Sequence, residues 1–391
     1  MEWKEVDIEQ TSIEIIDGDR GKNYPKNNEL TNSGYCLFLS AANVTKNGLQ
    51  FSNNSFITKE KDALLRKGKL MPQDIVLTTR GTVGNVGFYG DDVPYSNMRI
   101  NSGMVIIRPG EDFDTMFLYQ YLRSCYFRAQ ITQFQSGSAQ PQLPISTLQK
   151  MKVIKPDIDA QRRIASILSS LDRKIELNNK INADLEEMAQ AIFKNWFVDF
   201  EPFKGGKFVD SELGMIPEGW KVVKLGVFFP VKTGKKDANT ASVNGKYPFF
   251  SCSQNALCTD SYSFDCDAIL VAGNGDFNVK WYSGKFDAYQ RTYVLIPYNK
   301  KLLALLYYVV KRNLLTITSK ARGSVIRFIT KGNLTDFEFA IPRDLENNEI
   351  VDVFKSINEK IFANIKENSR LSLLRDTLLP RSMSGELEVP E

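Results

Sequence analysis

Two short motifs in the first half of the chain carry the residue types of a metal-dependent nuclease. Pro156-Asp157 is followed by Asp172-Arg173-Lys174, and in such enzymes carboxylates hold Mg²⁺ beside a catalytic lysine. The local periodicity, however, predicts a helix here. On a helix, residues two apart point to different faces, whereas on a strand they share one. We therefore interpret Asp172 and Lys174 as solvated helix charges rather than as a catalytic pair.

Other catalytic groups are missing from the sequence. The chain contains no histidine, which removes the usual general base and the commonest transition-metal ligand. It also contains neither a Gly-x-x-x-x-Gly-Lys phosphate loop nor the Asn/Asp-Pro-Pro-aromatic motif of adenine methyltransferases. We therefore expect no catalytic residue, no metal and no cofactor bound by this chain.

The five cysteines fit neither a zinc site nor a disulfide framework. They stand at positions 36, 125, 252, 258 and 266, and neither their number nor their spacing follows a known pattern of paired cysteines. We expect free thiols.

Two glycine-rich polar loops are the best candidates for contacts to nucleic acid. They span 79–85 and 273–280, and each follows an apolar run that begins with aspartate. Glycine lets a backbone approach DNA closely, and Arg, Asn and Lys can read base edges or bind phosphate. The predicted DNA-binding residues are Thr79, Arg80, Thr82, Asn85, Asn274, Asn278 and Lys280, with Arg99, Gln140, Arg291, Arg322 and Arg327 as weaker additions. The alternative is ordinary polar turns between strands, which use the same residue types.

These loops belong to a tandem repeat. Trp3-Lys4-Glu5-Val6 is echoed by Trp220-Lys221-Val222-Val223, and Gly137-Ser138 is echoed by Gly323-Ser324, 186 residues further on. Such self-similarity fixes the architecture of a chain. Each half is predicted to be a module of roughly 150 residues followed by one long helix. β-branched and apolar runs predict strands in the modules, and shorter helices are predicted over 116–133 and 301–315.

Both long helices have a heptad seam. Alternate steps of four and three from Ile164 and from Ile350 meet mainly apolar residues. Each seam also carries two asparagines near its middle, namely Asn178, Asn182, Asn364 and Asn368. Buried asparagine weakens a coiled coil but fixes its register. Antiparallel pairing would place Asn178 opposite Asn368 and Asn182 opposite Asn364. The alternative is two amphipathic helices that each pack on their own module.

At the junctions the chain resembles the specificity subunits of type I restriction-modification enzymes. Residues 210–221 look like the junction that opens the second half of those proteins, and Asp159-Ala160-Gln161-Arg162-Arg163-Ile164-Ala165 resembles the entry into their first spacer helix. The segments 137–156 and 323–342 resemble the stretches just before each helix. One departure is that Trp3 lacks the Pro-Glu-Gly lead seen before Trp220.

The resemblance implies an α+β fold. Two tandem α/β target-recognition domains would be separated by two long helices that form an antiparallel coiled coil with pseudo-two-fold symmetry. The expected boundaries are 1–156 for the first domain, 157–200 for the first spacer helix, 201–342 for the linker and second domain, and 343–391 for the second spacer helix and tail. Each domain would read one half of a bipartite double-stranded DNA site. A helix over 159–197 would be ~58 Å long, enough to span half-sites ~34 Å apart.

The resemblance also implies partners. Two modification subunits would supply S-adenosylmethionine-dependent adenine methylation, and two restriction subunits would supply ATP-driven translocation and Mg²⁺-dependent cleavage. The spacer helices would dock the modification subunits. The alternative is a coiled-coil interaction scaffold without base readout, and a stand-alone nuclease comes third.

The net charge of the chain is compatible with DNA binding but does not by itself indicate it. The net charge of +4 is mildly basic. No apolar run approaches the ~18 residues of a membrane span, and the first ten residues lack a signal-peptide core. We expect a cytoplasmic protein that does not enter a membrane.

Overall fold

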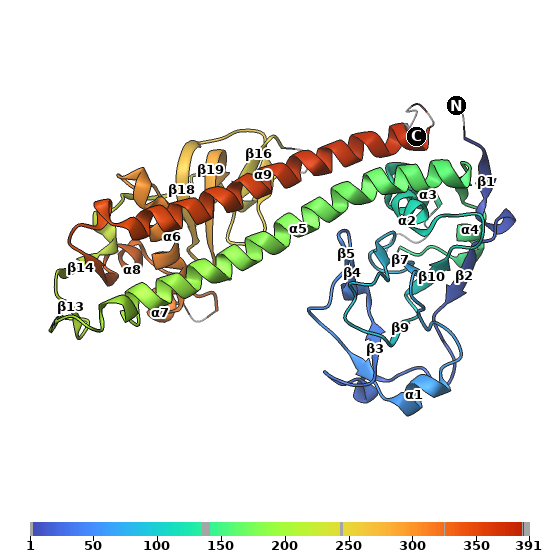
Figure 1. The fold of residues 1–391 in the computed structure, drawn as a ribbon, viewed down its shortest axis with the longest axis horizontal. Coiled ribbons are helices and arrows are strands. Elements are labelled where there is room, and N and C mark those ends of the chain that lie inside the picture. The colour runs from blue at the N-terminus through green and yellow to red at the C-terminus, as the bar shows by residue number, and fades with distance from the viewer. Residues whose placement is uncertain (1–2, 135–140, 243–244, 324, 385, 387–391) are drawn as a thin grey trace. The chain divides into compact units, whose positions relative to one another are not determined.

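The computed structural model describes residues 3–134, 141–242, 245–323, 325–384 and 386. These residues form two compact units: unit 1 is Met1–Glu176 with Glu367–Glu391, and unit 2 is Leu177–Lys366. Each unit holds a globular α/β domain and a part of each of two long helices, α5 (Ile158–Phe197, green in Figure 1) and α9 (Glu349–Met383, red). This mixture of strands and long helices confirms the predicted α+β class.

The domain of unit 1 is built on a four-stranded antiparallel sheet in the order β2-β10-β7-β8. The strands of unit 1 are β1 (Glu5–Asp7), β2 (Glu14–Asp17), β3 (Cys36–Leu39), β4 (Val44–Thr45), β5 (Gly48–Leu49), β6 (Phe56–Ile57), β7 (Ile75–Thr78), β8 (Val86–Phe88), β9 (Met98–Ile100), β10 (Met104–Arg108) and β11 (Lys152–Ile154). Its shorter helices are α1 (Lys59–Leu64), α2 (Thr115–Arg123), α3 (Cys125–Phe134) and α4 (Ile145–Gln149).

Strand β7 is buried on both faces because its side chains alternate between two cores. Ile75 and Leu77 pack with Phe117 of α2 in one core. Val76 packs with Leu37 of β3 in the other. A strand that is buried on both faces has a continuous run of apolar residues in its sequence, and β7 has this pattern. The strand is therefore a fixed base for the polar loop that follows it.

Unit 2 repeats this plan on a six-stranded sheet in the order β15-β20-β18-β19-β16-β17. The strands of unit 2 are β12 (Phe208–Val209), β13 (Ile216–Pro217), β14 (Trp220–Lys224), β15 (Val231–Thr233), β16 (Tyr247–Phe250), β17 (Leu257–Thr259), β18 (Phe264–Ala272), β19 (Val279–Ala288), β20 (Thr292–Leu295) and β21 (Glu338–Pro342), and its shorter helices are α6 (Leu303–Arg312), α7 (Leu314–Ser319) and α8 (Lys331–Thr335). In β18, Ile269 and Val271 pack with Leu305 of α6, whereas Leu270 enters a second core. Strand β18 thus corresponds to β7.

Each of the two predicted shorter helices is in fact a pair of helices. The first breaks at Ser124, whose backbone is extended and whose hydroxyl accepts a hydrogen bond from the Phe127 amide at 3.2 Å. The second breaks at Asn313, whose side chain donates to the Val309 carbonyl at 2.8 Å. Short polar side chains compete with the helical hydrogen bonds in this way, so a continuous apolar pattern did not reveal the breaks.

In unit 1, α5 and α9 are joined by a cluster of charges around Asp172. This carboxylate accepts hydrogen bonds from Gln120 and Arg123 of α2, at 2.7 and 2.9 Å, and from Arg375 of α9 at 2.8 Å. Burial disfavours the charged form of Asp172, but Arg123, Gln120 and Arg375 outweigh it and hold the pKa of Asp172 below its usual range. Lys174 pairs instead with Glu367 of α9 at 3.5 Å. Lys174 is exposed, as expected of a solvated helix charge, but Asp172 is half-buried and paired with two arginines, so the expectation of a solvated charge is wrong for Asp172.

In unit 2, the two helices run antiparallel. Phe193 of α5 contacts Phe354 of α9, with ring centroids 6.3 Å apart. Further along the same pair, the Asn364 amide donates to Asn182 at 2.8 Å. The predicted contact between Asn182 and Asn364 is therefore present, and the alternative of two separate surface helices is excluded. Asn178 is buried, and its expected position opposite Asn368 stays a prediction.

The five cysteines are unpaired. The described part of the chain contains no group of three or more His, Cys, Asp or Glu residues placed to hold a metal ion. Among the same residues, no helix has the length and apolar character needed to cross a bilayer.

Replacing both asparagines of the unit 2 pair with leucine is expected to raise the melting temperature, because two amides leave an apolar seam. The Asn364→Leu variant alone is expected to lower it, because the Asn182 amide then loses its partner. Circular dichroism melts of the wild type, both single variants and the double variant check this. A double variant that melts below the wild type would contradict it.

The Asp172→Asn variant is expected to lose about 2 kcal/mol of unfolding free energy at pH 7, because two arginines lose a shared carboxylate. The pKa of Asp172 is lower in the folded protein than in the unfolded chain, where it is roughly 4. The stabilisation by the Asp172 carboxylate is therefore complete above that unfolded pKa and is lost as the pH falls from there through the folded pKa. Urea unfolding at several pH values measures both. Asp184→Asn, which changes an exposed carboxylate in the middle of the same helix, is the control and should be neutral. A stability gap that does not narrow in acid would refute the assignment.

Candidate nucleic-acid interface

Three segments of unit 1 meet at the end of β7. The Thr79 amide donates to the Gly103 carbonyl at 2.8 Å, and the Leu143 amide donates to the Thr79 carbonyl at 2.9 Å. Arg80 and Gln142 form an isolated antiparallel bridge beside these bonds. We call this arrangement the unit 1 loop junction. It holds the start of the loop 79–85 from both sides by backbone contacts that do not depend on side-chain type.

Unit 2 contains the same junction. The Gly273 amide donates to the Arg291 carbonyl at 2.8 Å, and the Ile329 amide donates to the Gly273 carbonyl at 2.9 Å. Asn274 and Phe328 form the antiparallel bridge. Phe328 and Ile329 stand 186 residues after Gln142 and Leu143, the displacement of the sequence repeat. The two predicted loops are therefore equivalent in structure as well as in sequence.

Glycines give the unit 1 loop its shape. Gly81 and Gly84 have φ of 73° and 91°, a left-handed conformation that other residues rarely adopt. The Thr78 hydroxyl accepts a hydrogen bond from the Asn85 amide at 2.9 Å and closes the loop at its base. The turn is thereby fixed while its tip projects into solvent.

The predicted residues of this loop have different positions. Arg80 and Thr82 are exposed and can meet a ligand. Thr79 is buried, and its backbone belongs to the junction. Asn85 is half-buried and donates from its side chain to the Val44 carbonyl at 2.8 Å. Of the four, only Arg80 and Thr82 present their side chains to solvent.

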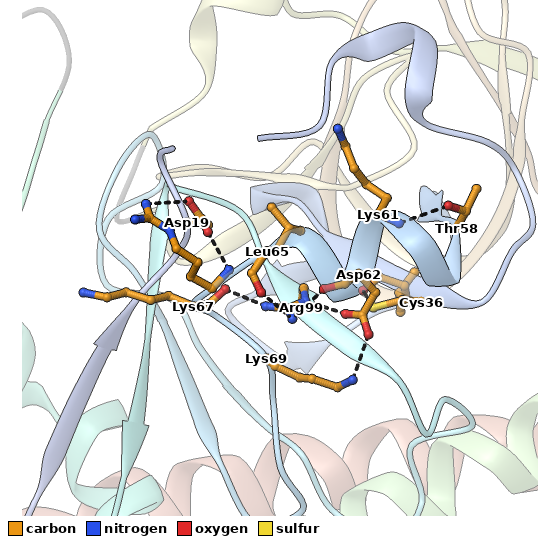
Figure 2. Close-up of polar contacts among 11 residues, drawn as sticks. Asp19, Cys36, Thr58, Lys61, Asp62, Leu65, Lys67, Lys69 and Arg99 are labelled. Atoms are coloured by element: carbon orange, nitrogen blue, oxygen red, sulfur yellow. Dashed lines mark hydrogen bonds and ion pairs between the residues drawn. The ribbon is translucent and has the colours of Figure 1, made fainter. Parts of the chain in front are cut away.

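The prediction that Arg99 binds DNA is not supported, because this side chain is buried (Figure 2). Its guanidinium donates to the Asp62 carboxylate, to the Lys67 carbonyl at 2.7 Å and to the Leu65 carbonyl at 3.0 Å. Burial disfavours ionisation of Asp62, but hydrogen bonds from Lys69 and Arg99 hold its pKa below the usual range. Arg99 therefore stabilises the interior of the domain.

Cys36 lies beside this buried charge cluster. Burial and the neighbouring negative charge of Asp62 raise the pKa of the Cys36 thiol to about 12. The thiolate is the reactive form of cysteine, so Cys36 is an inert core residue.

In unit 2, Asn278 and Lys280 connect two loops. The Asn278 side chain is buried and donates to the Cys252 and Asp276 carbonyls at 2.9 and 2.7 Å. The Lys280 ammonium donates to the Ser253 carbonyl at 2.7 Å, and burial lowers the pKa of Lys280. The Asn278 amide therefore makes its hydrogen bonds within the domain. Together, Asn278 and Lys280 hold the chain around position 252 against the loop 273–280.

The remaining predicted residues of unit 2 gather around its junction. Asn274 is half-buried, and Arg291, Arg322 and Arg327 are exposed. The backbones of Arg322 and Phe328 exchange two hydrogen bonds of 2.8 Å, and the Gly275 amide donates to the Arg327 carbonyl at 3.1 Å. The structure therefore brings three arginines to the junction, Arg291 from one segment and Arg322 and Arg327 from a single turn.

Two apolar residues of the same surface were missed by the sequence reasoning. Val325 and Ile326 are 94% and 59% exposed, and they lie between Arg322 and Arg327. A search for polar residues does not find them. The Val-Ile pair between two arginines could have indicated exposed apolar residues in this turn. Gln140, also predicted to bind DNA, lies outside the described residues.

The two units thus contain equivalent loop junctions, each with exposed arginine beside it. Residues 2–187 and 217–371 each match the type I restriction modification DNA specificity domain. The chain belongs to this family of type I specificity subunits, and the two matches confirm the tandem repeat.

Individual relatives agree with this assignment. The chain is 40% identical over 178 residues to the type I restriction enzyme EcoDI specificity subunit of Escherichia coli, an alignment that covers 44% of this chain and 40% of that protein. It is 28% identical to the MjaIX specificity subunit of Methanocaldococcus jannaschii over 81% of this chain and 78% of that protein. The crystal structure of the S subunit from M. genitalium has the same fold, with a TM-score of 0.58 at 16% identity, covering 99% of this chain and 97% of that one.

Arg80→Ala is expected to weaken DNA binding by the assembled enzyme by about 1–3 kcal/mol, because Arg80 is the exposed cation at the unit 1 junction. Fluorescence anisotropy at moderate salt measures the loss. Arg66→Ala removes an exposed arginine that takes no part in the junction and pairs with Asp19 instead, and it should leave the affinity unchanged. Equal affinity of Arg80→Ala and wild type would remove Arg80 from the interface.

Proposed function

We propose that each loop junction reads one half of a bipartite double-stranded DNA target. The observation that carries this proposal is the repetition of one backbone arrangement in both units, each with exposed arginine beside it. Arginine can form two parallel hydrogen bonds to guanine or bind phosphate. A fixed backbone that presents variable side chains is a suitable device for reading different sequences.

The two surfaces carry different side chains. The unit 1 junction presents Arg80 and Thr82, whereas the unit 2 junction presents Arg291, Arg322 and Arg327. Base readout depends on the donors and acceptors presented to the grooves. We therefore propose that the two half-targets differ in sequence, and that the complete target is asymmetric.

We further propose that the chemistry is carried out by partner subunits. Two modification subunits would bring S-adenosylmethionine, and two restriction subunits would bring ATP and Mg²⁺ and act on DNA in the cytoplasm. The long helices would dock the modification subunits. Large apolar side chains exposed along the two helices support a protein partner there, among them Ile167, Leu177, Met188, Leu373 and Leu374.

Selection from random DNA pools tests the proposed function. The chain alone, and the chain mixed with its modification subunit, are incubated with the pool at several salt concentrations, and bound DNA is separated by gel shift and sequenced. The expected result is a gapped two-part motif with salt-dependent binding. Salt-independent behaviour with no enriched sequence would favour an interaction scaffold without base readout.

A further inference from the structure

We infer that Val325 and Ile326 read thymine in the half-target of unit 2, by contact with the C5-methyl group of the base. The inference rests on the proposed function, because it names the chemical feature of DNA that the turn beside the unit 2 junction would recognise.

Val325 and Ile326 form an apolar pair in solvent. They are 94% and 59% exposed, and neither side chain carries a hydrogen-bonding group. Single exposed apolar residues are common on protein surfaces and need no explanation. This pair differs because its members are adjacent in sequence and stand beside the unit 2 junction, to which Phe328 contributes its bridge with Asn274. A partner that covers the pair would therefore lie beside the junction.

The backbone that carries the pair is anchored to the domain. Arg322 and Phe328 exchange two backbone hydrogen bonds of 2.8 Å, and the Arg327 guanidinium donates to the Thr318 carbonyl at 3.0 Å. Ile329, which follows, is 3% exposed and belongs to the unit 2 core. Because this base is fixed, a ligand that covers the apolar pair need not order the surrounding backbone first.

Gly323 makes the turn narrow. Its φ is 101°, and a Cβ atom at this position would lie 2.2 Å from the Ile326 carbonyl oxygen. The two backbone segments therefore approach more closely than a side chain at position 323 would allow. The major groove of B-DNA, about 12 Å wide, admits a pair of β-strands, whereas the minor groove is only about 6 Å wide. A narrow turn with paired ends suits the major groove.

The charge around the pair favours DNA over a protein partner. Residues 313–335 include Lys320, Arg322, Arg327 and Lys331 and no acidic residue. Such cations bind phosphates and fix the position of a protein on the duplex. The partner that this surface fits is therefore a polyanion.

Thymine is the base that an apolar pair can read. Among the groups that the base pairs present in the major groove, the C5-methyl group of thymine is apolar, whereas the others are hydrogen-bond donors or acceptors. The side chains of Val325 and Ile326 can neither donate nor accept, so a methyl contact is the readout open to them. Such a contact removes apolar surface of both partners from water.

Replacement of thymine by deoxyuridine tests the inference, because deoxyuridine pairs with adenine in the same way but lacks the methyl group. The target of the assembled enzyme is first identified by selection from random DNA, and each thymine of a synthetic target duplex is then replaced singly. Fluorescence anisotropy is expected to show a position at which the wild type binds the deoxyuridine duplex about fourfold more weakly, the effect of one buried carbon. The Val325→Ser/Ile326→Ser variant is expected to bind the thymine and deoxyuridine duplexes equally at that position.

Val227→Ser is the control. It changes an exposed apolar residue of unit 2 that takes no part in the junction, and it should keep the fourfold difference. Equal binding of both duplexes by the wild type at every thymine, or a difference that the double serine variant retains at every position, would overturn the inference. A double serine variant that no longer assembles with its modification subunit would also overturn it, because the pair would then contact protein. A selection that yields no motif would instead refute the proposed function, and this inference with it.

Discussion

The pairing of α5 with α9 is the interaction on which both domains depend. In unit 1, Leu168 of α5 and Leu379 of α9 enter the same core as the α2 helix. In unit 2, Phe193 of α5 and Phe354 of α9 enter the core around α6. Each domain is therefore completed by the helix of its own repeat and by the helix of the other repeat. The sequence repeat and the structural unit are not the same segment of chain, and a cut between the repeats would leave both cores incomplete.

This dependence explains where polar groups are buried along the helices. Asp172 is held by arginines of α2 and α9, and Asn182 is held by Asn364. Such groups cost free energy unless they are satisfied, so they permit one register of the two helices and penalise the others. The register in turn determines which part of each helix packs into the core of each domain.

The sequence predicted regular features well. The heptad seams gave both helices and the contact between Asn182 and Asn364, and the 186-residue repeat gave the equivalent loops. It could not separate exposed polar residues from buried ones. Arg99 and Asn278 have the residue types and loop-adjacent positions of DNA contacts, yet Arg99 is bonded to Asp62 and Asn278 to Cys252, 37 and 26 residues away in sequence. Only the tertiary fold places those partners. The exposure of Val325 was missed for the opposite reason, since an apolar residue is expected to be buried.

The central claim is that the two junctions read separate halves of one target. It is tested most directly by determining the target of an assembled enzyme whose specificity subunit carries Arg322→Ala and Asn274→Ala, both at the unit 2 junction. The account predicts that the base preference relaxes in one half of the motif while the other half and the gap between them are unchanged. Relaxation of both halves together, or of neither, would contradict it.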